Sequence, residues 1–395
     1  MQQEYDIVIV GSGLAGNCLA LMLKNTGLRI AIVEAATREQ LVALPTGDRA
    51  LALAAGTVET LDSLGLWQGI SHSATSIKHI LISDQGHFGK TRLSAQKEHV
   101  EALGYVISAR DIETHIANLV TESSIEVIAP ARVVGLMSSD HEVFINLKQD
   151  KESFNITAKL LVGADGGLSS VRQLMGINQK ITEYGQTALV TTIKSTLSNN
   201  NTAYERFTAS GPLALLPVGS HLCSVVWTRK DEDATALMLG SEADFIAELQ
   251  QCFGYKLGQL CLTAPRRAFP LSLIRAEKMV VDRTVIIGNA AHQLHPVAGQ
   301  GFNLGFRDVV QLAEQLIKQY ETNNDIGDAS ILNTYANTRT QDHDRTIGFT
   351  DTVVKVFSNE WLALVTARNI GLTLLDYVPF AKSVLTRHAM GMAVK

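Results

Sequence analysis

The sequence predicts an α/β fold: a Rossmann-like nucleotide-binding domain interleaved with an antiparallel β-sheet domain and followed by C-terminal helices. Glycine-rich turns near residues 11, 163 and 288 each follow an apolar strand, and they predict the first domain. Short β-type runs between Thr182 and Arg275, separated by turn-forming residues, predict the second. Beyond Thr346 the pattern becomes helical again.

The first glycine-rich turn, Gly11-Ser12-Gly13-Leu14-Ala15-Gly16, has the context of a dinucleotide-binding site. The apolar strand 5–10 precedes it, the helical segment 17–24 follows, and the strand 29–33 ends at Glu34. In such a unit, successive glycines permit the turn, let a pyrophosphate approach the backbone, and let helix and strand pack closely. We therefore expect a dinucleotide here, with Glu34 accepting hydrogen bonds from a ribose.

The segment 288–303 combines the last of the three glycine-rich turns with the start of a helix. The apolar strand 284–287 precedes it, and an apolar-periodic helix from about Leu304 to Lys318 follows. Free N–H groups at a helix N-terminus attract negatively polarised ligands, and glycines at 299, 301 and 305 let the backbone approach a flat ligand. Considered alone, the segment is equally compatible with a plain turn.

The block 159–172, which lies between these two in the sequence, again runs from an apolar strand into a glycine turn and a helix start. Together, the N-terminal fingerprint, this GADGxxSxVR block and the GNAAH…HPxxGQGxN block resemble the FAD-dependent aromatic hydroxylases of the para-hydroxybenzoate hydroxylase type. The likeness is closest to the 2-polyprenyl-6-methoxyphenol hydroxylases of ubiquinone biosynthesis, through the segments 48–53, 211–217 and 368–372. It covers essentially the whole chain.

One position departs from the pattern of the class. Most of these hydroxylases carry Asp where this chain has Asn289, and that Asp accepts hydrogen bonds from the ribityl chain of FAD. The amide oxygen of Asn289 can still accept, although the negative charge is lost. In having Asn at this position, the chain resembles the methoxyphenol hydroxylase branch of the class.

The resemblance implies FAD as the cofactor, NAD(P)H as a transient reductant and O₂ as the co-substrate. A C4a-hydroperoxyflavin would transfer oxygen to the aromatic ring of a polyprenyl phenol, converting 2-polyprenyl-6-methoxyphenol to the benzoquinol. Because only one dinucleotide fingerprint is present, FAD should occupy it, and the loop 44–49 is a candidate mobile element. Two alternatives stay open: another ring hydroxylation of the pathway, or a non-catalytic flavoprotein subunit of its enzyme complex.

The resemblance also implies which residues surround the flavin. Beside the ring we expect Pro296 and the backbone of Gly299, Gln300 and Gly301, whose N–H groups would stabilise negative charge on the reduced flavin. No acid–base residue is assigned. The expected FAD contacts are Gly11, Gly13, Leu14, Ala15, Gly16, Glu34, Arg49, Arg110, Asp165, Gly166, Gly288, Asn289, Gly299, Gly301, Phe302 and Asn303. Arg110 can equally be a surface charge on the helix 111–120.

Composition excludes several other classes of function. The net charge of −5, without a Lys/Arg cluster, argues against nucleic-acid binding. The four cysteines lack metal-ligand spacing and are interpreted as buried thiols in a reducing compartment. His292 and His295 have no third ligand in the sequence, so we expect no metal. With a first strand by residue 5 and no long apolar run, we expect a cytoplasmic chain without a signal peptide.

The domains are expected to alternate along the chain. The FAD-binding domain should comprise 1–72, 105–178 and 273–345, and the substrate-binding β domain 73–104 and 179–272. The remaining segment, 346–395, is apolar with spaced charges, which is typical of amphipathic helices. These helices either cover the FAD domain or dock peripherally to the inner membrane or to other ubiquinone-biosynthesis enzymes.

Other flavoenzymes and nicotinamide enzymes fit the sequence less well. A flavin halogenase would carry a W-x-W-x-I-P run, whereas Trp67, Trp227 and Trp361 are isolated. A nicotinamide dehydrogenase would leave the blocks at 163 and 288 unexplained.

Overall fold

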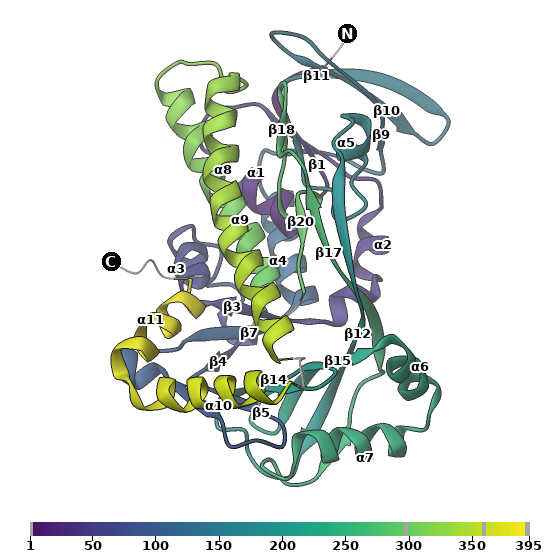
Figure 1. The fold of residues 1–395 in the computed structure, drawn as a ribbon. Helices are drawn as coiled ribbons and strands as arrows, with labels where there is room; N and C mark the ends of the chain where they lie inside the picture. The colour runs from purple at the N-terminus through teal and green to yellow at the C-terminus, as the bar shows by residue number, and fades with distance from the viewer. Residues whose placement is uncertain (1–2, 296–298, 358–360, 392–395) are drawn as a thin grey trace.

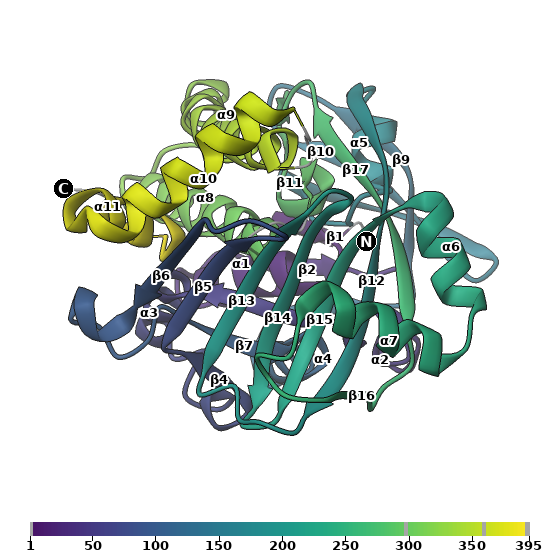
Figure 2. The same ribbon diagram turned by 60° about the horizontal axis from the view of Figure 1, so that its bottom comes forward.

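A computed structural model describes residues 3–295, 299–357 and 361–391. It confirms the α/β fold, with a mostly parallel sheet, a large antiparallel sheet and helices at the C-terminal end (Figures 1 and 2).

The eight-stranded sheet carries the nucleotide-binding signature. Its order is β18 (Val280–Val281), β19 (Thr284–Ile286), β11 (Glu152–Gly163), β1 (Gln3–Val10), β2 (Ile30–Val33) and β8 (Glu126–Ile128). In addition, β10 (Val143–Gln149) pairs with β11, and β9 (Arg132–Ser138) pairs with β10. Strands β19, β11, β1, β2 and β8 run parallel. Its apolar core also takes side chains from α1 (Leu14–Leu23), α4 (Ala109–Thr121) and α8 (Gln300–Glu321). This combination of parallel strands and helices is the arrangement that the fingerprint predicts.

The nine-stranded sheet forms the second layer. Its order is β20 (His292–Gln293), β17 (Arg267–Ala276), β12 (Gln179–Ser195), β15 (Leu222–Lys230), β14 (Gly211–Gly219), β13 (Thr202–Thr208), β5 (His79–Asp84) and β6 (Lys90–Ser94), with β16 (Leu260–Leu262) beside β12. Figure 2 shows α6 (Asp231–Leu239) and α7 (Glu242–Phe253) across its outer face. Trp227 and Phe245 pack together there, with ring centroids 5.6 Å apart.

A small sheet joins the two layers. It consists of β3 (Ala50–Ala54), β7 (Gly104–Ser108) and β4 (Thr75–Ile77). Ile77 and Val106 of this sheet form one buried cluster with Ala203 of β13, so the small sheet contacts the inner face of the large one. The short helices are α2 (Arg38–Val42), η1 (Pro45–Asp48), α3 (Ala55–Ser63), η2 (Ser71–Ser73), η3 (Ala95–Glu98), α5 (Ser170–Leu174) and η4 (Gly288–Ala290).

The last helices are α9 (Ala329–Phe357), α10 (Leu362–Tyr377) and α11 (Pro379–Ala389). Helix α9 runs unbroken through residue 345, where the third part of the FAD-binding domain was expected to end. Helix α10 packs against β6, at the edge of the antiparallel sheet. Two hydrogen bonds fix this contact, from the Gly89 N–H to Asn369 Oδ1 and from the Thr91 hydroxyl to the Leu372 carbonyl. The expectation that these helices cover only the nucleotide-binding domain is therefore wrong for α10.

The interpretation of all four cysteines as buried thiols needs one correction. Cys18, Cys223 and Cys252 are buried, whereas Cys261 is exposed. Burial raises the pKa of the Cys18 thiol to about 12. Cys261 lies on the short strand β16, which pairs only with the end of β12, so its neighbours do not cover it.

Candidate active site

The three glycine-rich turns meet at one edge of the parallel sheet. Val10 at the end of β1 lies beside Gly163 at the end of β11, and Gly163 lies beside Ile286 at the end of β19. Ligands of open α/β sheets bind at the carboxyl ends of the strands. Segments separated by more than a hundred residues thus contribute to one candidate site.

The first turn contains glycines with two different functions. Gly11 has a φ of +105°, and a Cβ there would lie 2.6 Å from the Ala164 carbonyl oxygen. A Cβ on Gly16 would lie 2.0 Å from the Gly11 carbonyl oxygen, so helix and strand touch at this position. At Gly13, by contrast, a Cβ would meet no atom within 4 Å. Gly13 is the N-cap of α1, which leaves open space in front of a helix N-terminus.

Glu34 faces this turn from the end of β2. Its Oε2 accepts hydrogen bonds from the Ser12 N–H at 2.8 Å and the Ser12 hydroxyl at 3.1 Å. Its Oε1 accepts from the Ala36 N–H at 2.9 Å. The carboxylate is thus fixed beside the turn and keeps acceptor capacity for a ribose hydroxyl.

The second turn is organised by Asp165. Its Oδ2 accepts hydrogen bonds from the N–H groups of Ser170 (2.7 Å) and Val171 (3.2 Å) at the start of α5. Its Oδ1 is buried and has no partner among the described residues. Such an orphaned acceptor is costly unless a ligand or water satisfies it. Gly166, with a φ of +80°, carries the chain through the turn.

Sequence reasoning did not assign a role to Arg172 in this turn. Its buried guanidinium donates to the Gly167 carbonyl and to the Ala290 carbonyl, both at 2.8 Å. One side chain therefore ties the second turn to the third. The arginine was visible as the last residue of the GADGxxSxVR block, but its partner in the third turn was not.

The third turn lies against α1 and α8. Gly288 has a φ of +58°, and a Cβ there would lie 3.3 Å from the Ala15 side chain. A Cβ on Gly305 of α8 would lie 3.2 Å from the Gly288 Cα, so this turn and α8 approach closely. Asn289 is exposed, and its side chain makes no hydrogen bond to any other described residue. That amide is therefore available to a ligand.

The start of α8 provides the surface expected beside the ring. Gly299 is the N-cap, with a φ of +61°, and a Cβ there would lie 2.9 Å from the Ala52 side chain. Gln300 and Gly301 form the first turn of this 22-residue helix, and a Cβ on Gly301 would meet nothing within 4 Å. Pro296 lies outside the described residues. The free N–H groups of Gln300 and Gly301 give this helix start the positive polarity that a reduced flavin requires.

The side chain of Asn303 has a structural function here. Its amide donates to the carbonyls of Ala52 (3.0 Å) and Gly299 (2.8 Å), and its oxygen accepts from the Ala54 N–H (2.9 Å). Those bonds hold β3 against α8, so only the backbone of Asn303 is free for a cofactor. Phe302, the preceding residue, is half-buried and stacks on Phe306.

The two arginines expected near FAD lie around the loop 44–49. The Arg49 Nε donates to the Thr46 carbonyl at 2.9 Å, and burial lowers the pKa of its guanidinium. Arg110 instead pairs with Asp48 at 2.7 Å, and Arg267 pairs with the same carboxylate at 3.3 Å. Much of the loop forms the 3-10 helix η1, held by these contacts.

This arrangement fits FAD. Open space at Gly13 and Gly301 leaves room for a pyrophosphate and a flat ring. The buried Asp165 Oδ1 lacks a partner among the described residues, and the exposed amide of Asn289 is available to a ligand. The sequence profile of the FAD binding domain family matches residues 4–350. The chain belongs to this family. The prediction of FAD as the cofactor is confirmed, with NAD(P)H and O₂ as the reductant and co-substrate typical of the class.

Individual relatives point to hydroxylases within this FAD-binding family. The chain is 33% identical over 392 residues to the ubiquinone hydroxylase UbiL of Rhodospirillum rubrum, covering 98% of this chain and 89% of that one. It is 28% identical to the 3-demethoxyubiquinol 3-hydroxylase of Escherichia coli, covering 99% of both. The crystal structure of p-nitrophenol 4-monooxygenase PnpA from Pseudomonas putida DLL-E4 matches with a TM-score of 0.81 at 18% identity over 100% of both chains. The prediction of an FAD-dependent hydroxylase is confirmed.

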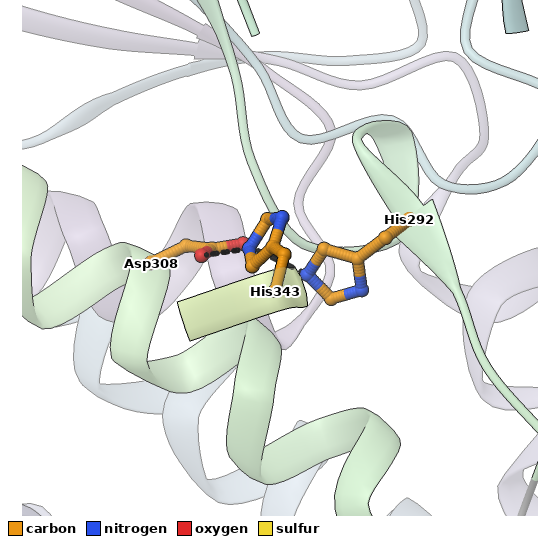
Figure 3. A group of neighbouring side chains, drawn as sticks. All are labelled: His292, Asp308 and His343. Carbon is orange, nitrogen blue, oxygen red and sulfur yellow. Dashed lines mark hydrogen bonds and ion pairs between the residues drawn. The ribbon is translucent and has the colours of Figure 1, made fainter. Parts of the chain in front are cut away.

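Behind the flavin turn of this FAD-binding protein lies a buried cluster that the sequence reasoning missed. Figure 3 shows His292 and His343 converging on the carboxylate of Asp308. His292 Nε2 is 2.9 Å from Oδ2, and His343 Nε2 is 2.8 Å from Oδ1. Arg339 Nε donates to Oδ1 at 2.6 Å, and the Gly288 N–H donates to Oδ2 at 3.1 Å. Asp308 thus links the third turn to α8 and α9.

The contacts of this cluster favour a hydrogen-bond network over a metal centre. The three side chains have ligand atoms within 4.8 Å of one another, which is compatible with a metal ion. However, each carboxylate oxygen already has two donors, which uses the four acceptor positions of a carboxylate. The positive guanidinium of Arg339 would also repel a cation. Burial alone would raise the pKa of the Asp308 carboxyl, but charge interactions and hydrogen bonds with both histidines hold it below its usual range.

Proposed function

We propose that this protein hydroxylates the aromatic ring of a polyprenyl phenol in ubiquinone biosynthesis. The observation that carries the proposal is the similarity to ubiquinone hydroxylases over nearly the whole chain, together with the open turns around the FAD position. The specific reaction that we propose is conversion of 2-polyprenyl-6-methoxyphenol to the benzoquinol. The alternatives are another ring hydroxylation of the pathway and a non-catalytic flavoprotein subunit.

Bound FAD would supply the oxygen-transfer chemistry, and the residues of the chain would bind and orient it. In this proposal the pyrophosphate lies at Gly13, where the N-terminus of α1 attracts negative charge. Glu34 accepts from the adenosine ribose, and Asp165 and Asn289 bind the ribityl portion. The N–H groups at the start of α8 then face the ring.

The inner face of the antiparallel sheet would exclude water from the phenol. Phe207 of β13 stacks on Phe357 of α9, with ring centroids 3.9 Å apart. Ala203, four residues earlier on β13, packs against Ile77 and Val106 of the small sheet. These contacts close the inner face on both sides of the central part of β13 with apolar side chains, and an apolar enclosure suits a prenylated aromatic ring.

The reductant would bind without a Rossmann unit of its own. In the described residues, the parallel strands β19, β11, β1, β2 and β8 belong to the sheet that carries the turn at 11–16, and the other parallel pair, β13 with β5, lies inside the nine-stranded sheet. If FAD occupies that turn, NAD(P)H must bind transiently and leave after hydride transfer. The 3-10 helix η1 is held by the ion pairs of its Asp48 with Arg110 and Arg267. Breaking these two contacts would release η1.

The test is a coupled assay of the FAD-loaded protein. We expect NADPH-dependent O₂ consumption to increase when 2-prenyl-6-methoxyphenol is added, and mass spectrometry to detect a product heavier by one oxygen atom. Product analysis in a deletion strain would identify the ring carbon. Flavin reduction with no hydroxylated product from any prenylated phenol would favour the non-catalytic alternative.

We also propose that the helices α10 and α11 form a docking surface for a membrane, from which the substrate is taken. None of the described helices is long and apolar enough to cross a membrane. Three charges of these helices are paired within the protein, whereas Arg387 is exposed: Asp376 pairs with Arg92 and Lys382, and Arg368 pairs with Asp84. Large apolar side chains are exposed instead, namely Trp361, Ile370, Leu374, Tyr377, Val378 and Phe380. Exposed apolar and aromatic residues of this kind are typical of membrane-interface helices.

A further inference from the structure

Glu205 has an unusual place in the antiparallel sheet. On β13, Tyr204 points to the outer face, where it contacts Phe253 of α7, and Ala203 points to the inner face. Because side chains alternate along a strand, Glu205 shares the inner face with Ala203 and Phe207. Glu205 therefore lies between two positions, Ala203 and Phe207, where apolar contacts close the inner face.

The register identifies the neighbours of Glu205 across the sheet. Glu205 lies beside Ala214 of β14 and Ile82 of β5, and Ala214 lies beside Val226 of β15. Laterally paired residues point to the same face. Glu205, Ala214 and Val226 are all only half-buried, although their face is turned toward the other domain. Their small or medium side chains therefore leave space in front of the carboxylate.

This space lies on the flavin side of the sheet. Ala50 of β3 packs into the cluster that contains Ala203, and Ala52 of the same strand lies under Gly299. Successive residues on one strand are separated by about 3.4 Å. The strand β3 thus contacts both Gly299, in the turn expected beside the flavin ring, and the part of β13 that carries Glu205.

Among the residues that the structure describes, the carboxylate of Glu205 has no hydrogen-bond or ion-pair partner. Its Oε1 is enclosed, yet it accepts no hydrogen bond from any described residue. Two other carboxylates near this face do have partners, since Asp84 pairs with Arg368 and Asp48 pairs with Arg267. Burial raises the pKa of Glu205 to about 7. A carboxyl with an enclosed, unsatisfied oxygen and a raised pKa indicates a functional group.

We propose that Glu205 is a catalytic residue that contacts the phenol hydroxyl and accepts its proton during ring hydroxylation. This inference rests on the proposed function of the site. In the step, the phenol O–H bond breaks, an O–H bond forms on the Glu205 carboxylate, and the electron pair stays on the phenol oxygen. The negative charge enriches the ring in electrons before it attacks the oxygen that O₂ and NAD(P)H supply through the flavin. When the ring becomes aromatic again, the C–H bond at the hydroxylated carbon breaks, and its proton leaves with the second oxygen atom of O₂ as water. The proton held by Glu205 returns to the phenol oxygen of the product.

The test compares Glu205→Gln with the wild type, both loaded with FAD. The amide keeps the size of the side chain but cannot accept the proton. We expect kcat to fall by roughly 100-fold or more, the range for loss of a general base. In the wild type, kcat should rise with pH through an ionisation near 7, and this dependence should disappear in the variant. Glu248→Gln, on α7 at the outer face, is the matched control and should keep both the rate and the profile.

A second readout does not require turnover. A short-chain 2-prenylphenol is titrated into each protein, and the phenolate absorbance band is followed by difference spectroscopy. We expect the wild type, but not Glu205→Gln, to bind the ligand with a phenolate band near neutral pH. An unchanged phenolate band or an unchanged pH profile in Glu205→Gln would overturn the proposal, as would loss of FAD from this variant.

The two failures are distinguishable. If the wild type makes no hydroxylated product, the proposed function fails, and the phenolate titration still decides whether Glu205 accepts a proton from a bound phenol. If the wild type hydroxylates the phenol and Glu205→Gln does so at the same rate, only the role of Glu205 is wrong.

Discussion

Gly11 and Gly13, two residues apart in the first turn, differ in what a side chain would meet. At Gly11 the positive φ and the Ala164 carbonyl exclude any side chain, so this glycine serves the fold. Gly13 has an extended backbone with a φ of −72°, which any residue adopts, and no atom lies near its missing Cβ. A glycine without a structural need at a helix N-terminus indicates space kept for a ligand.

We therefore expect Gly13→Val to lose FAD while the chain stays folded. The branched side chain would occupy the space of the pyrophosphate, and we expect FAD affinity to fall by roughly 100-fold or more, about 3 kcal/mol. The unfolding free energy of the FAD-free protein should change by about 0.5 kcal/mol at most. Flavin fluorescence titration and urea unfolding measure the two quantities. Gly11→Val is the contrasting variant, which should fail to fold stably; equal FAD affinity of Gly13→Val and wild type would contradict the assignment.

Asp308 gives a second prediction for a single residue. In Asp308→Asn the buried Arg339 loses its partner at 2.6 Å, and the amide nitrogen would face N–H donors. Removing one member of a buried ion pair costs about 3 kcal/mol or more. Asp342, which pairs with the same arginine but is more exposed, supplies the control, and Asp342→Asn should cost clearly less. Urea unfolding compares the two; equal losses would show that Asp308 is not the centre of the network.

At the scale of elements, the sequence predicted the strands and turns that depend on local pattern. The runs at 5–10, 203–207 and 222–227 each lie within a strand, because apolar and β-branched residues form such strands without distant partners. Helix α8 begins at Gln300 rather than near Leu304, because Gly299 in a left-handed conformation starts it earlier. Local pattern does not locate domain boundaries as well, since α9 continues across the boundary expected at residue 345.

Elements that depend on distant partners were harder to predict. Asp308 and His343 lie on different helices, and each resembles an ordinary helix residue in the sequence. Only the spacing of Arg339 and His343, four residues apart on one helix face, hinted at a common partner. Glu205 was read as part of a plain β-strand, since alternation cannot show that a carboxyl lies between two domains without a partner. Burial of charge is decided by packing, which the local pattern does not contain.

The docking surface of α10 and α11 can be tested through its exposed side chains. We expect Leu374→Ser, Tyr377→Ser and Phe380→Ser in one chain to lower binding to vesicles of phosphatidylcholine and phosphatidylglycerol by roughly tenfold or more. Burying each such side chain in an apolar phase contributes about 1.5–3 kcal/mol. Vesicle flotation measures the bound fraction.

The control for this surface lies on the opposite side of the antiparallel sheet. Leu239 and Tyr255 are also large, apolar and exposed, but they flank α7. Leu239→Ser with Tyr255→Ser should leave vesicle binding unchanged. A triple variant of α10 and α11 that floats like the wild type would show that another surface, or a partner protein, receives the substrate.

At the scale of the whole molecule, the candidate site depends on contacts between both large sheets and the helices. The parallel sheet supplies the turns at 11, 163 and 288, whereas β20, directly after the third turn, pairs with β17 of the antiparallel sheet. Helix α9 connects the two layers: His343 reaches Asp308 behind the flavin turn, and Phe357 reaches Phe207 on the sheet. Stability and flavin binding should therefore respond together to changes at this junction.

Acid should weaken this junction through His295. The residue is 2% exposed, both ring nitrogens lack a partner among the described residues, and its ring packs edge-on against Tyr184. Burial lowers the pKa of His295 to about 4. The unfolded chain binds this proton near pH 6.5 and the folded chain does not, so the stabilisation is complete above about pH 6.5 and is lost as the pH falls toward 4. Burial also lowers the pKa of His343, which adds a loss in the same direction.

Glu205 contributes to the pH dependence of stability with the opposite sign. Because its pKa is raised in the folded protein, the unfolded chain releases this proton first as the pH rises, and the stability then falls. The wild-type profile alone therefore mixes two effects, and His295→Phe, which keeps an aromatic ring against Tyr184, separates them. Between about pH 7.5 and pH 5, we expect the wild type to lose about 2 kcal/mol of unfolding free energy relative to His295→Phe. Urea unfolding at both pH values, with FAD at one fixed saturating concentration, measures this difference. His141→Phe, at an exposed position, should follow the wild type. Parallel pH profiles of wild type and His295→Phe would show that His295 takes up its proton in the folded protein as readily as in the unfolded chain.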